Sequence, residues 1–539
     1  MTDISTSGVT GERNPVAEPG PRTAADAVTP ELVARLVRGI TAGDQPTKGI
    51  SRNPFTGEVL AEIPESTVED VATAFIRART AQRAWAQRPL ADRARVLLRF
   101  HDLLLAAQAE LLDLIQAETG KARAHAFEEV SVAAVEARHY ARAGAKYLRP
   151  RRRGGVIPAL TQVTEVRQAK GVIGQISPWN YPLALFAGDA LPAFMAGNAV
   201  VTKPDTQTTL TALRTRELLV EAGLPAELWQ IVVGDGPVIG PEVVDRADYV
   251  SFTGSTRTGR DVAQRAAARL IGASMELGGK NAMLVLADAD LDKAAEGAVR
   301  ACFSSAGQLC VSIERLFVAR EVADAFLARF TARTRALRLG NTLGWGADMG
   351  SLVSKRQLDN VVRHVEEAVD NGARVLAGGR ARPDVGPLFY EPTVLEGVDA
   401  ASAVCAEETF GPVVSVYRFD SEEEAVAQAN STPYGLNASV WSRDTGRGRR
   451  IALRLHSGTV NVNEAYAAAY GSVAAPMGGM GDSGVGRRHG AEGILKYTEG
   501  QTVAVQRLLP MGPAFGMDDQ GYARLMTRAL GAMKSLRLK

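Results

Sequence analysis

Cysteine, net charge and long apolar runs are all scarce in this chain. Its 539 residues hold three cysteines, Cys302, Cys310 and Cys405, and this sparse, odd count argues against a disulfide framework and for a reducing compartment. The 62 basic and 60 acidic residues nearly cancel, which gives no general reason to expect a nucleic acid partner. No apolar run is long enough to cross a bilayer. We therefore expect a cytoplasmic protein.

The first residues also lack the basic start and apolar core of a signal peptide. Residues 1–30 are rich in Gly, Pro, Ser, Thr and Ala, which predicts a disordered tail. Order is expected to begin near Thr29, because Thr29 can cap a helix and Pro30 suits its first turn. From about Val68 to Tyr147 the apolar spacing predicts helices, and Gly120 suits a helix C-terminus.

Strands and helices alternate in the middle of the chain. Between residues 171 and 276, short apolar segments such as NAVVTK and DYVSF alternate with helical patterns, which predicts a parallel sheet covered on both faces. A second α/β stretch is expected from about 278 to 470. The segments TQVTEVRQAKG and GQTVAVQRLL predict further strands. The predicted fold class is therefore α/β.

Cys310 follows a short loop, SSAGQLC, in which Gly307 lets the backbone turn and leaves room for a ligand near the sulfur. Taken alone, a single cysteine is more often a small buried apolar side chain than a nucleophile. The chain also lacks a G-x-G-x-x-G motif after the first strand of the predicted sheet. Neither catalysis nor dinucleotide binding therefore follows from any one motif.

Nine short motifs, taken in order, nevertheless resemble those of the aldehyde dehydrogenase superfamily over roughly residues 45–505. They are PWN from Pro178, KP from Lys203, FTGSTRTG from Phe252, MELGGKN from Met275, GQLC ending at Cys310, EETFGPV from Glu407, NSTPYGL from Asn430, GTVNVN from Gly458 and PMGGMGDSGVGR from Pro476. Each pattern is weak by itself, whereas nine in order are specific. The resemblance implies a Rossmann-type cofactor domain, an α/β catalytic domain and a small β arm for oligomerisation.

The resemblance also suggests domain boundaries. Residues 31–150 and 171–276 are expected to form the cofactor domain, and residues 277–470 the catalytic domain. Strands within 151–170 and 495–510 are expected to join copies of the chain into a homodimer or homotetramer. Residues 511–539 are expected to form a C-terminal helical extension. The apolar face of that helix is more typical of docking on protein than of contact with a membrane surface.

The resemblance assigns three catalytic residues and no metal. Cys310 is the expected nucleophile, because a thiolate adds to an aldehyde and later leaves well from a thioester. The side chain of Asn180 and the main-chain N–H of Cys310 are the expected donors to the oxyanion. Glu276 is the expected general base that hydrolyses the thioester. Its presence favours water over coenzyme A as the acyl acceptor, and hence a free carboxylic acid as the product.

A nicotinamide dinucleotide is implied by the same resemblance. Its pyrophosphate is expected at a helix N-terminus formed by Gly254, Ser255 and Gly259, where main-chain N–H groups face an anion. Lys203 is expected at the adenosine ribose and Glu408 at the nicotinamide ribose. The other residues expected at the cofactor are Ser177, Pro178, Trp179, Leu277 and Phe410.

Thr206 bears on the choice between NADP and NAD. It stands three positions after Lys203, where NAD-preferring members of the family usually carry a glutamate. A threonine lacks the carboxylate that would repel the 2′-phosphate of NADP. The neighbouring Asp205 would act in the opposite direction if its side chain pointed inward. We therefore expect NADP, with NAD as the alternative.

The segment from PMGGMGDSGVGRRHG to TVAVQRL resembles the actinobacterial second type of succinate-semialdehyde dehydrogenase, which implies succinic semialdehyde as the substrate. The carboxylate of this aldehyde calls for arginine or similar donors. Better-known members have two arginines where this chain has Gly188 and Ser304. Other cations would then be needed, and the candidates are Arg138, Arg142 and Arg315.

The alternative substrate is a hydrophobic or aromatic aldehyde accepted with broad specificity. Four apolar side chains near the motifs would suit an apolar entrance to the site, although plain core packing is the more common reason for such side chains. They are Leu185, Phe186, Phe303 and Leu309.

Overall fold

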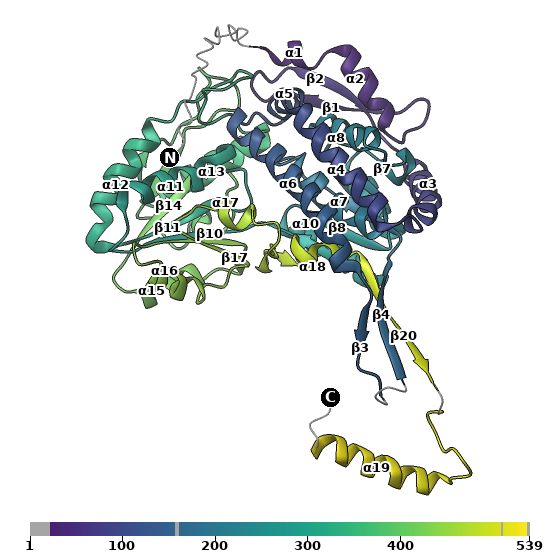
Figure 1. The fold of residues 1–539 in the computed structure, drawn as a ribbon. Coiled ribbons are helices and arrows are strands. Elements are labelled where there is room, and N and C mark those ends of the chain that lie inside the picture. The colour runs from purple at the N-terminus through teal and green to yellow at the C-terminus, as the bar shows by residue number, and fades with distance from the viewer. Residues whose placement is uncertain (1–21, 157–160, 508–509, 536–539) are drawn as a thin grey trace, which may run out of the picture.

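The computed structural model describes residues 22–156, 161–507 and 510–535. Two α/β lobes lie side by side, and a narrow β arm projects from one of them (Figure 1). Each lobe is built on its own central sheet. One large apolar cluster fills the first lobe and a second fills the other.

Helices dominate the first part of the chain, as their apolar spacing predicts. They are α2 (Pro30–Leu36), α3 (Val68–Ala86), α4 (Leu90–Ala106), α5 (Gln108–Thr119) and α6 (Arg123–Leu148). The hydroxyl of Thr29 accepts a hydrogen bond from the N–H of Leu32 and caps α2. Gly120 ends α5 with a φ of 71°, a left-handed conformation that suits glycine. Both predicted helix ends are confirmed.

The predicted start of order near Thr29 is too late. Helix α1 (Ala24–Ala27) precedes it, and Thr23 and Asp26 form a reciprocal capping box at its N-terminus. Ala24 and Val28 pack in the core of the first lobe, so burial of apolar surface orders this segment despite its composition. The rest of the predicted tail, residues 1–21, lies outside the described residues.

The first sheet has the strand order β19-β9-β8-β5-β6-β7. Its strands are β5 (Val172–Ile176), β6 (Ala199–Lys203), β7 (Trp229–Ile231), β8 (Tyr249–Thr253), β9 (Gly272–Glu276) and β19 (Gly484–Val485). All pairs are parallel except that of β19 with β9. The connecting helices are α7 (Ala184–Ala196), α8 (Thr209–Glu221), α9 (Gly236–Arg246) and α10 (Thr256–Ala268). The predicted parallel sheet is confirmed, and its carboxyl edge carries Lys203 and Glu276.

The second sheet has the order β12-β13-β14-β11-β10-β16-β17. Its strands are β10 (Asn281–Val285), β11 (Ile313–Ala319), β12 (Arg374–Ala377), β13 (Thr393–Glu396), β14 (Val413–Phe419), β16 (Asn437–Trp441) and β17 (Thr459–Val462). The helices of this lobe include α11 (Leu291–Phe303), α12 (Arg320–Arg335), α13 (Lys355–Asp370), α15 (Glu422–Ala429) and α16 (Thr445–Ala452). The loops before β11 and β14 carry Cys310 and Glu408, respectively.

The arm is an antiparallel sheet with the order β20-β4-β3. Its strands are β3 (Arg151–Arg153), β4 (Thr161–Ala169) and β20 (Thr498–Gln506). Beyond its tip lies α19 (Asp519–Ser535), well away from both lobes (Figure 1). Within the described part of the chain, no helix combines the length and the hydropathy needed to cross a membrane.

Candidate active site

The loop that carries Cys310 adopts a strained backbone. After α11 the chain enters a turn in which Ser305, Ala306 and Gly307 have φ values of 53°, 54° and 71°. A Cβ atom at Gly307 would lie 2.0 Å from the carbonyl oxygen of Gly411, so no larger residue fits there without moving main chain. Two consecutive non-glycine residues in the left-handed region are costly, and such strain is concentrated at functional sites.

Cys310 differs from the other cysteines in the charged groups that act on its thiol. It is partly exposed, as is Cys405, whereas Cys302 is fully buried in the core of the second lobe. Burial, with smaller contributions from the carboxyl groups of Glu276 and Glu408, raises the pKa of the Cys310 thiol to about 12, and the charge of Arg488 opposes this rise. The resting thiol therefore needs a base or a cation beside it to become a nucleophile.

Asn180 is fixed beside this loop from two directions. Its side-chain Nδ2 donates a hydrogen bond to the carbonyl oxygen of Gln308, at 3.1 Å. Its own carbonyl oxygen accepts one from the ammonium of Lys121, at 2.6 Å. Lys121 is buried and also pairs with Glu129 at 2.6 Å. A second oxygen of Glu129 accepts from the N–H groups of Leu183 and Ala184 at the start of α7. Sequence reasoning did not single out Lys121 or Glu129.

Glu276 ends strand β9 and is 7% exposed. Burial raises the pKa of its carboxyl group to about 7, and the nearby cations Arg488 and Lys496 limit the rise. Its Oε1 atom has no hydrogen-bond partner among the described residues. A carboxyl group that titrates near neutral pH is well matched to the work of a general base.

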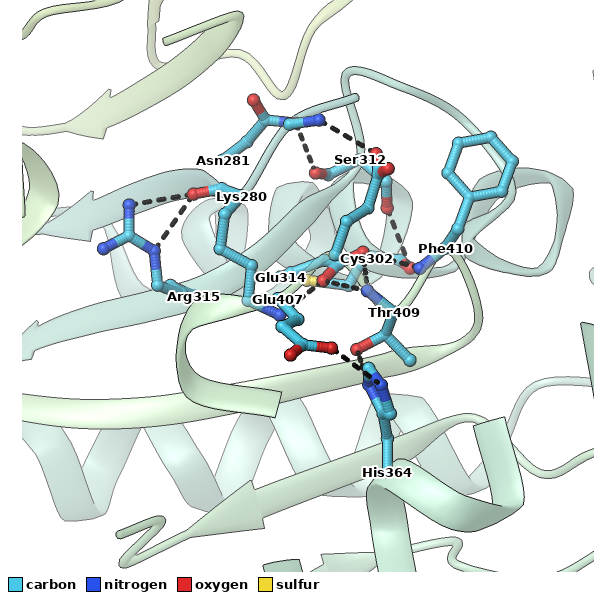
Figure 2. Close-up of polar contacts among 12 residues, drawn as sticks. Lys280, Asn281, Cys302, Ser312, Glu314, Arg315, His364, Glu407, Thr409 and Phe410 are labelled. Atoms are coloured by element: carbon cyan, nitrogen blue, oxygen red, sulfur yellow. Dashed lines mark hydrogen bonds and ion pairs between the residues drawn. The ribbon is translucent and has the colours of Figure 1, made fainter. Parts of the chain in front are cut away.

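Thr409 and Phe410, which follow Glu408 in the chain, lie on a segment that a buried ion pair holds in place (Figure 2). The carboxylate of Glu314 accepts hydrogen bonds from Lys280 Nζ at 2.5 Å and from the N–H groups of Thr409 and Phe410, each at 2.9 Å. Glu408 Oε1 accepts from the N–H of Gly279 at 2.9 Å. The ring of Phe410 meets that of Trp179 edge-on, with centroids 5.6 Å apart. The ion pair of Lys280 and Glu314 was also missed from the sequence.

The carboxyl edge of the first sheet carries groups that fit a dinucleotide. Ser255 caps the N-terminus of α10 by accepting from the N–H of Thr258, and a Cβ atom at Gly259 would lie 2.3 Å from Leu277. The buried ammonium of Lys203 has one hydrogen-bond partner in the described part of the chain, the carbonyl oxygen of Pro204. An under-satisfied buried cation beside a helix N-terminus suits a ligand with phosphate and hydroxyl groups.

Asp205 and Thr206, on which the prediction of NADP over NAD depends, lie in the turn after β6. Asp205 accepts a hydrogen bond from the N–H of Gln207 and so caps the short helical turn Thr206–Thr208. The methyl group of Thr206 lies close to Gly49, where an added Cβ atom would come within 2.6 Å of it. Ser177, which follows β5, has a buried hydroxyl with no hydrogen-bond partner among the described residues.

None of the three proposed arginines is available to bind a substrate carboxylate inside the protein. Arg138 and Arg142 are exposed on α6. The guanidinium of Arg315 is bound by three carbonyl oxygens, those of Lys280, Gln428 and Ala429. At Gly188 an added Cβ atom would lie 2.7 Å from Glu136, so a carboxylate adjoins this position. Glu136 in turn pairs with His489 at 2.6 Å.

The four apolar side chains that were considered as the lining of a substrate entrance pack in the core instead. Phe186 stacks on Trp229, with ring centroids 4.4 Å apart, and Phe303 stacks on Phe330 at 6.0 Å. Leu185 and Leu309 belong to the buried cluster of the second lobe. Plain packing therefore accounts for all four.

Comparison with known proteins places this site in a family. The model described as "Aldehyde dehydrogenase family" matches residues 40–503. A protein of Mycolicibacterium smegmatis named "Putative succinate-semialdehyde dehydrogenase (NADP(+))" is 53% identical over 482 residues, which are 89% of this chain and 93% of that protein. A betaine aldehyde dehydrogenase of Cereibacter sphaeroides is 39% identical over 462 residues, 85% of this chain and 93% of its own length.

Two solved structures are similar over most of their length. The crystal structure of an E. coli NADP dependent enzyme superposes with a TM-score of 0.82 and 34% identity, covering 85% of this chain and 95% of that one. The structure of PnpE in complex with nicotinamide adenine dinucleotide gives a TM-score of 0.83 and 34% identity, covering 87% and 96%.

Proposed function

Because the chain belongs to the aldehyde dehydrogenase family, and is thus an oxidoreductase, we propose that it oxidises succinic semialdehyde to succinate with NADP. One observation carries the proposal: Cys310, Asn180 and Glu276 come from three separate segments and meet at one place. Asn180 is bonded to Gln308 in the cysteine loop, and the charge of Glu276 acts on the Cys310 thiol.

The proposed acylation uses Cys310 and Asn180. The Cys310 thiol first loses its proton to water; the thiolate sulfur then forms a bond to the aldehyde carbon, and the carbonyl oxygen becomes an oxyanion. Asn180 Nδ2 has a second N–H beyond the one bonded to Gln308, and it donates to this oxyanion together with the N–H of Cys310. A bound nicotinamide dinucleotide supplies the acceptor for the hydride that leaves the carbon. Cys310 is then held as a thioester.

The proposed hydrolysis uses Glu276. Its carboxylate takes a proton from a water molecule while the water oxygen bonds to the thioester carbon. The carbon–sulfur bond breaks, the carboxylic acid leaves and Cys310 is returned as a thiolate. The Oε1 atom of Glu276, which has no partner in the part of the chain that the structure describes, is an acceptor suited to that water.

The proposed cofactor site uses the carboxyl edge of the first sheet. The N-terminus of α10, with Gly254, Ser255 and Gly259, would hold the pyrophosphate. Lys203 and Glu408 would hold the two riboses. The lack of a carboxylate at Thr206 supports NADP, as does the name of the M. smegmatis relative. The remaining proposed cofactor contacts are Ser177, Pro178, Trp179, Leu277 and Phe410.

A hydrophobic or aromatic aldehyde is the second candidate substrate. The observation that favours it is the absence of arginine at Gly188 and Ser304, combined with the carboxylate of Glu136 beside Gly188. A pocket wall that carries a carboxylate is a poor partner for a substrate carboxylate unless His489 compensates it.

An aldehyde panel crossed with NADP and NAD tests the function. We expect the highest kcat/KM for succinic semialdehyde with NADP, and a higher value for benzaldehyde or hexanal would refute the substrate. Cys310→Ser should abolish cofactor reduction with every aldehyde that the parent oxidises. Glu276→Gln should give one burst of reduced cofactor followed by slow turnover; unchanged steady-state turnover would remove Glu276 from its proposed role.

We also propose that the arm joins copies of the chain into a homodimer or homotetramer in the cytoplasm. Strand β20 is exposed along almost its whole length and displays Val503 and Val505, and such an edge is prone to pair with another strand. Three cysteines without a disulfide suit a reducing compartment. Light scattering after size exclusion tests the assembly, and a monomer at micromolar concentration would refute it.

A further inference from the structure

A buried group of charges lies behind Glu276. Arg488 Nη2 donates to Asp189 at 2.6 Å and to the hydroxyl of Thr253 at 2.6 Å. Asp189 also accepts from Lys496 Nζ at 3.2 Å and from the hydroxyl of Tyr497 at 3.0 Å. The side chains of Arg488 and Asp189 are 8% and 4% exposed. One carboxylate is thus shared by two cations.

The sheet places Arg488 next to Glu276. Thr253, which binds Arg488, is the register partner of Glu276 across the parallel strands β8 and β9. On the other side of β9, Gly484 of β19 pairs with Glu276. The main chain of Arg488 is bonded in both directions to that of Met477. The residue after Met477 is Gly478, where a Cβ atom would lie 3.1 Å from Glu276 Oε1.

The charges do not balance without Glu276. Arg488 and Lys496 carry two positive charges and Asp189 carries one negative charge, so one positive charge is left over. Glu276 Oε1 and Arg488 Nε are both buried, and neither has a hydrogen-bond partner among the described residues. A buried acceptor and a buried donor on neighbouring segments are complementary, and buried polar groups are normally paired.

We propose that Arg488, anchored by Asp189, is a positioning residue that keeps Glu276 in the carboxylate form needed to hydrolyse the thioester at neutral pH. The inference rests on the proposed function, because it gives Glu276 a partner in that same reaction. Arg488 does not itself exchange protons, since a guanidinium stays charged throughout the working range. It acts through its charge and its contact with Thr253.

The electrostatics of Glu276 agree with this geometry. Burial raises the pKa of Glu276 to about 7, and Arg488 is the strongest of the groups that oppose the rise. Lys496 and His489 also lower the pKa, while Asp189 raises it. Other charged or titratable groups around the site are Cys310, on whose thiol the charge of Glu276 acts, Arg487, which donates to the carbonyl oxygens of Gly479 and Gly486, and Glu136, which pairs with His489. Three tyrosines also adjoin it: Tyr497 donates to Asp189, the charges of Asp189 and Glu276 act on Tyr249, and that of Arg488 acts on Tyr470.

The test measures hydrolysis of the acyl-enzyme without cofactor. An activated ester such as p-nitrophenyl acetate should acylate Cys310 in a burst of nitrophenolate, after which hydrolysis sets the steady rate. In Arg488→Gln we expect the burst to remain. The pH profile of the steady rate should move about one unit to higher pH. At about pH 6.5 the rate should fall roughly tenfold, and at high pH it should recover.

Two further variants separate charge from structure. Arg488→Lys keeps the positive charge and should leave the profile near that of the parent. Asp189→Asn removes a negative charge while keeping a hydrogen-bond acceptor, so it should move the profile to lower pH. A purely structural role predicts no such opposite shifts. Arg265→Gln is the matched control, because Arg265 forms an exposed ion pair with Asp245, and its profile should be parental.

Each outcome decides either the role of Arg488 or the proposed function. A folded Arg488→Gln enzyme with the parental pH profile would overturn the role of Arg488. If that variant fails to fold, a parental profile in Asp189→Asn overturns it instead. A burst that survives Cys310→Ser would refute the proposed nucleophile, and with it the proposed function, whatever the behaviour of Arg488.

Discussion

The buried pair of Lys280 and Glu314 should control how firmly the segment that carries Glu408 and Phe410 is held. Their side chains are 0% and 4% exposed. Glu314 also binds the N–H groups of Thr409 and Phe410, which directly follow Glu408. We predict that Glu314→Gln destabilises the protein and raises KM for NADP, because the amide cannot balance Lys280 and holds the segment less firmly.

The size of the effect follows from burial. Removing one partner of a buried ion pair costs about 3–5 kcal/mol, since the other charge is left uncompensated in the interior. Glutamine keeps one acceptor oxygen, which places the expected loss near the lower end of that range. The double variant Lys280→Met/Glu314→Gln removes the stranded charge as well. It should therefore recover about half of the lost free energy of unfolding.

Urea unfolding and initial-rate kinetics at varied NADP measure the two effects. Glu62→Gln is the control, because the pair of Glu62 with Lys48 is exposed, with side chains 56% and 59% accessible. Such a pair contributes at most about 1 kcal/mol. The reasoning is refuted if Glu314→Gln loses no more stability than Glu62→Gln, or if the double variant is less stable than Glu314→Gln.

Three further predictions concern the reaction. Gly307→Ala places a Cβ atom 2.0 Å from the carbonyl oxygen of Gly411 at a φ of +71°, so it should cost more than about 2 kcal/mol and slow acylation; an unchanged melting temperature and burst rate would contradict this. The pKa of Glu276 is about 7, so if this carboxylate is the base as proposed, the thioester hydrolysis rate should rise with pH through about 7 and then level off, and a flat single-turnover profile between about pH 6 and 8 would contradict it. Thr206→Glu should lower kcat/KM for NADP relative to NAD about tenfold, by repulsion of the 2′-phosphate; an unchanged ratio would show that the turn after β6 does not face that phosphate.

Local signals in the sequence predicted local structure well. The cap at Thr29 and the left-handed turn at Gly120 depend on neighbours within one helical turn, and both are confirmed. Strand–helix alternation predicted the parallel sheet because, in such a sheet, each strand is followed in the sequence by a helix that covers a face of the sheet. The helix at Ala24–Ala27 was missed because composition outweighed the capping signal of Thr23 and Asp26.

Contacts between distant segments could not be predicted in the same way. Asp189 and Arg488 are 299 residues apart, and Glu136 and His489 are 353 apart. No periodicity links such residues, and their pairing depends on how sheet and helices pack. The motifs supplied the candidate roles of Cys310, Glu276 and Asn180, whereas the ion pairs that surround them had no sequence signal of their own. The search for a substrate arginine failed for the same reason: the orientation of Arg315 is a tertiary property.

Strand β20 of the arm comes near the end of the sequence, which affects the order in which the protein folds. Gln168 of β4 bonds Gln501 of β20, 333 residues further along the chain, and the yellow strand β20 lies along the blue strand β4 (Figure 1). Contacts between such distant residues form late, because a long loop must close first. During synthesis the ribosome releases Cys310 well before Arg488 and Lys496. The nascent protein therefore holds the proposed nucleophile for some time before the charges proposed to act on Glu276 have been synthesised.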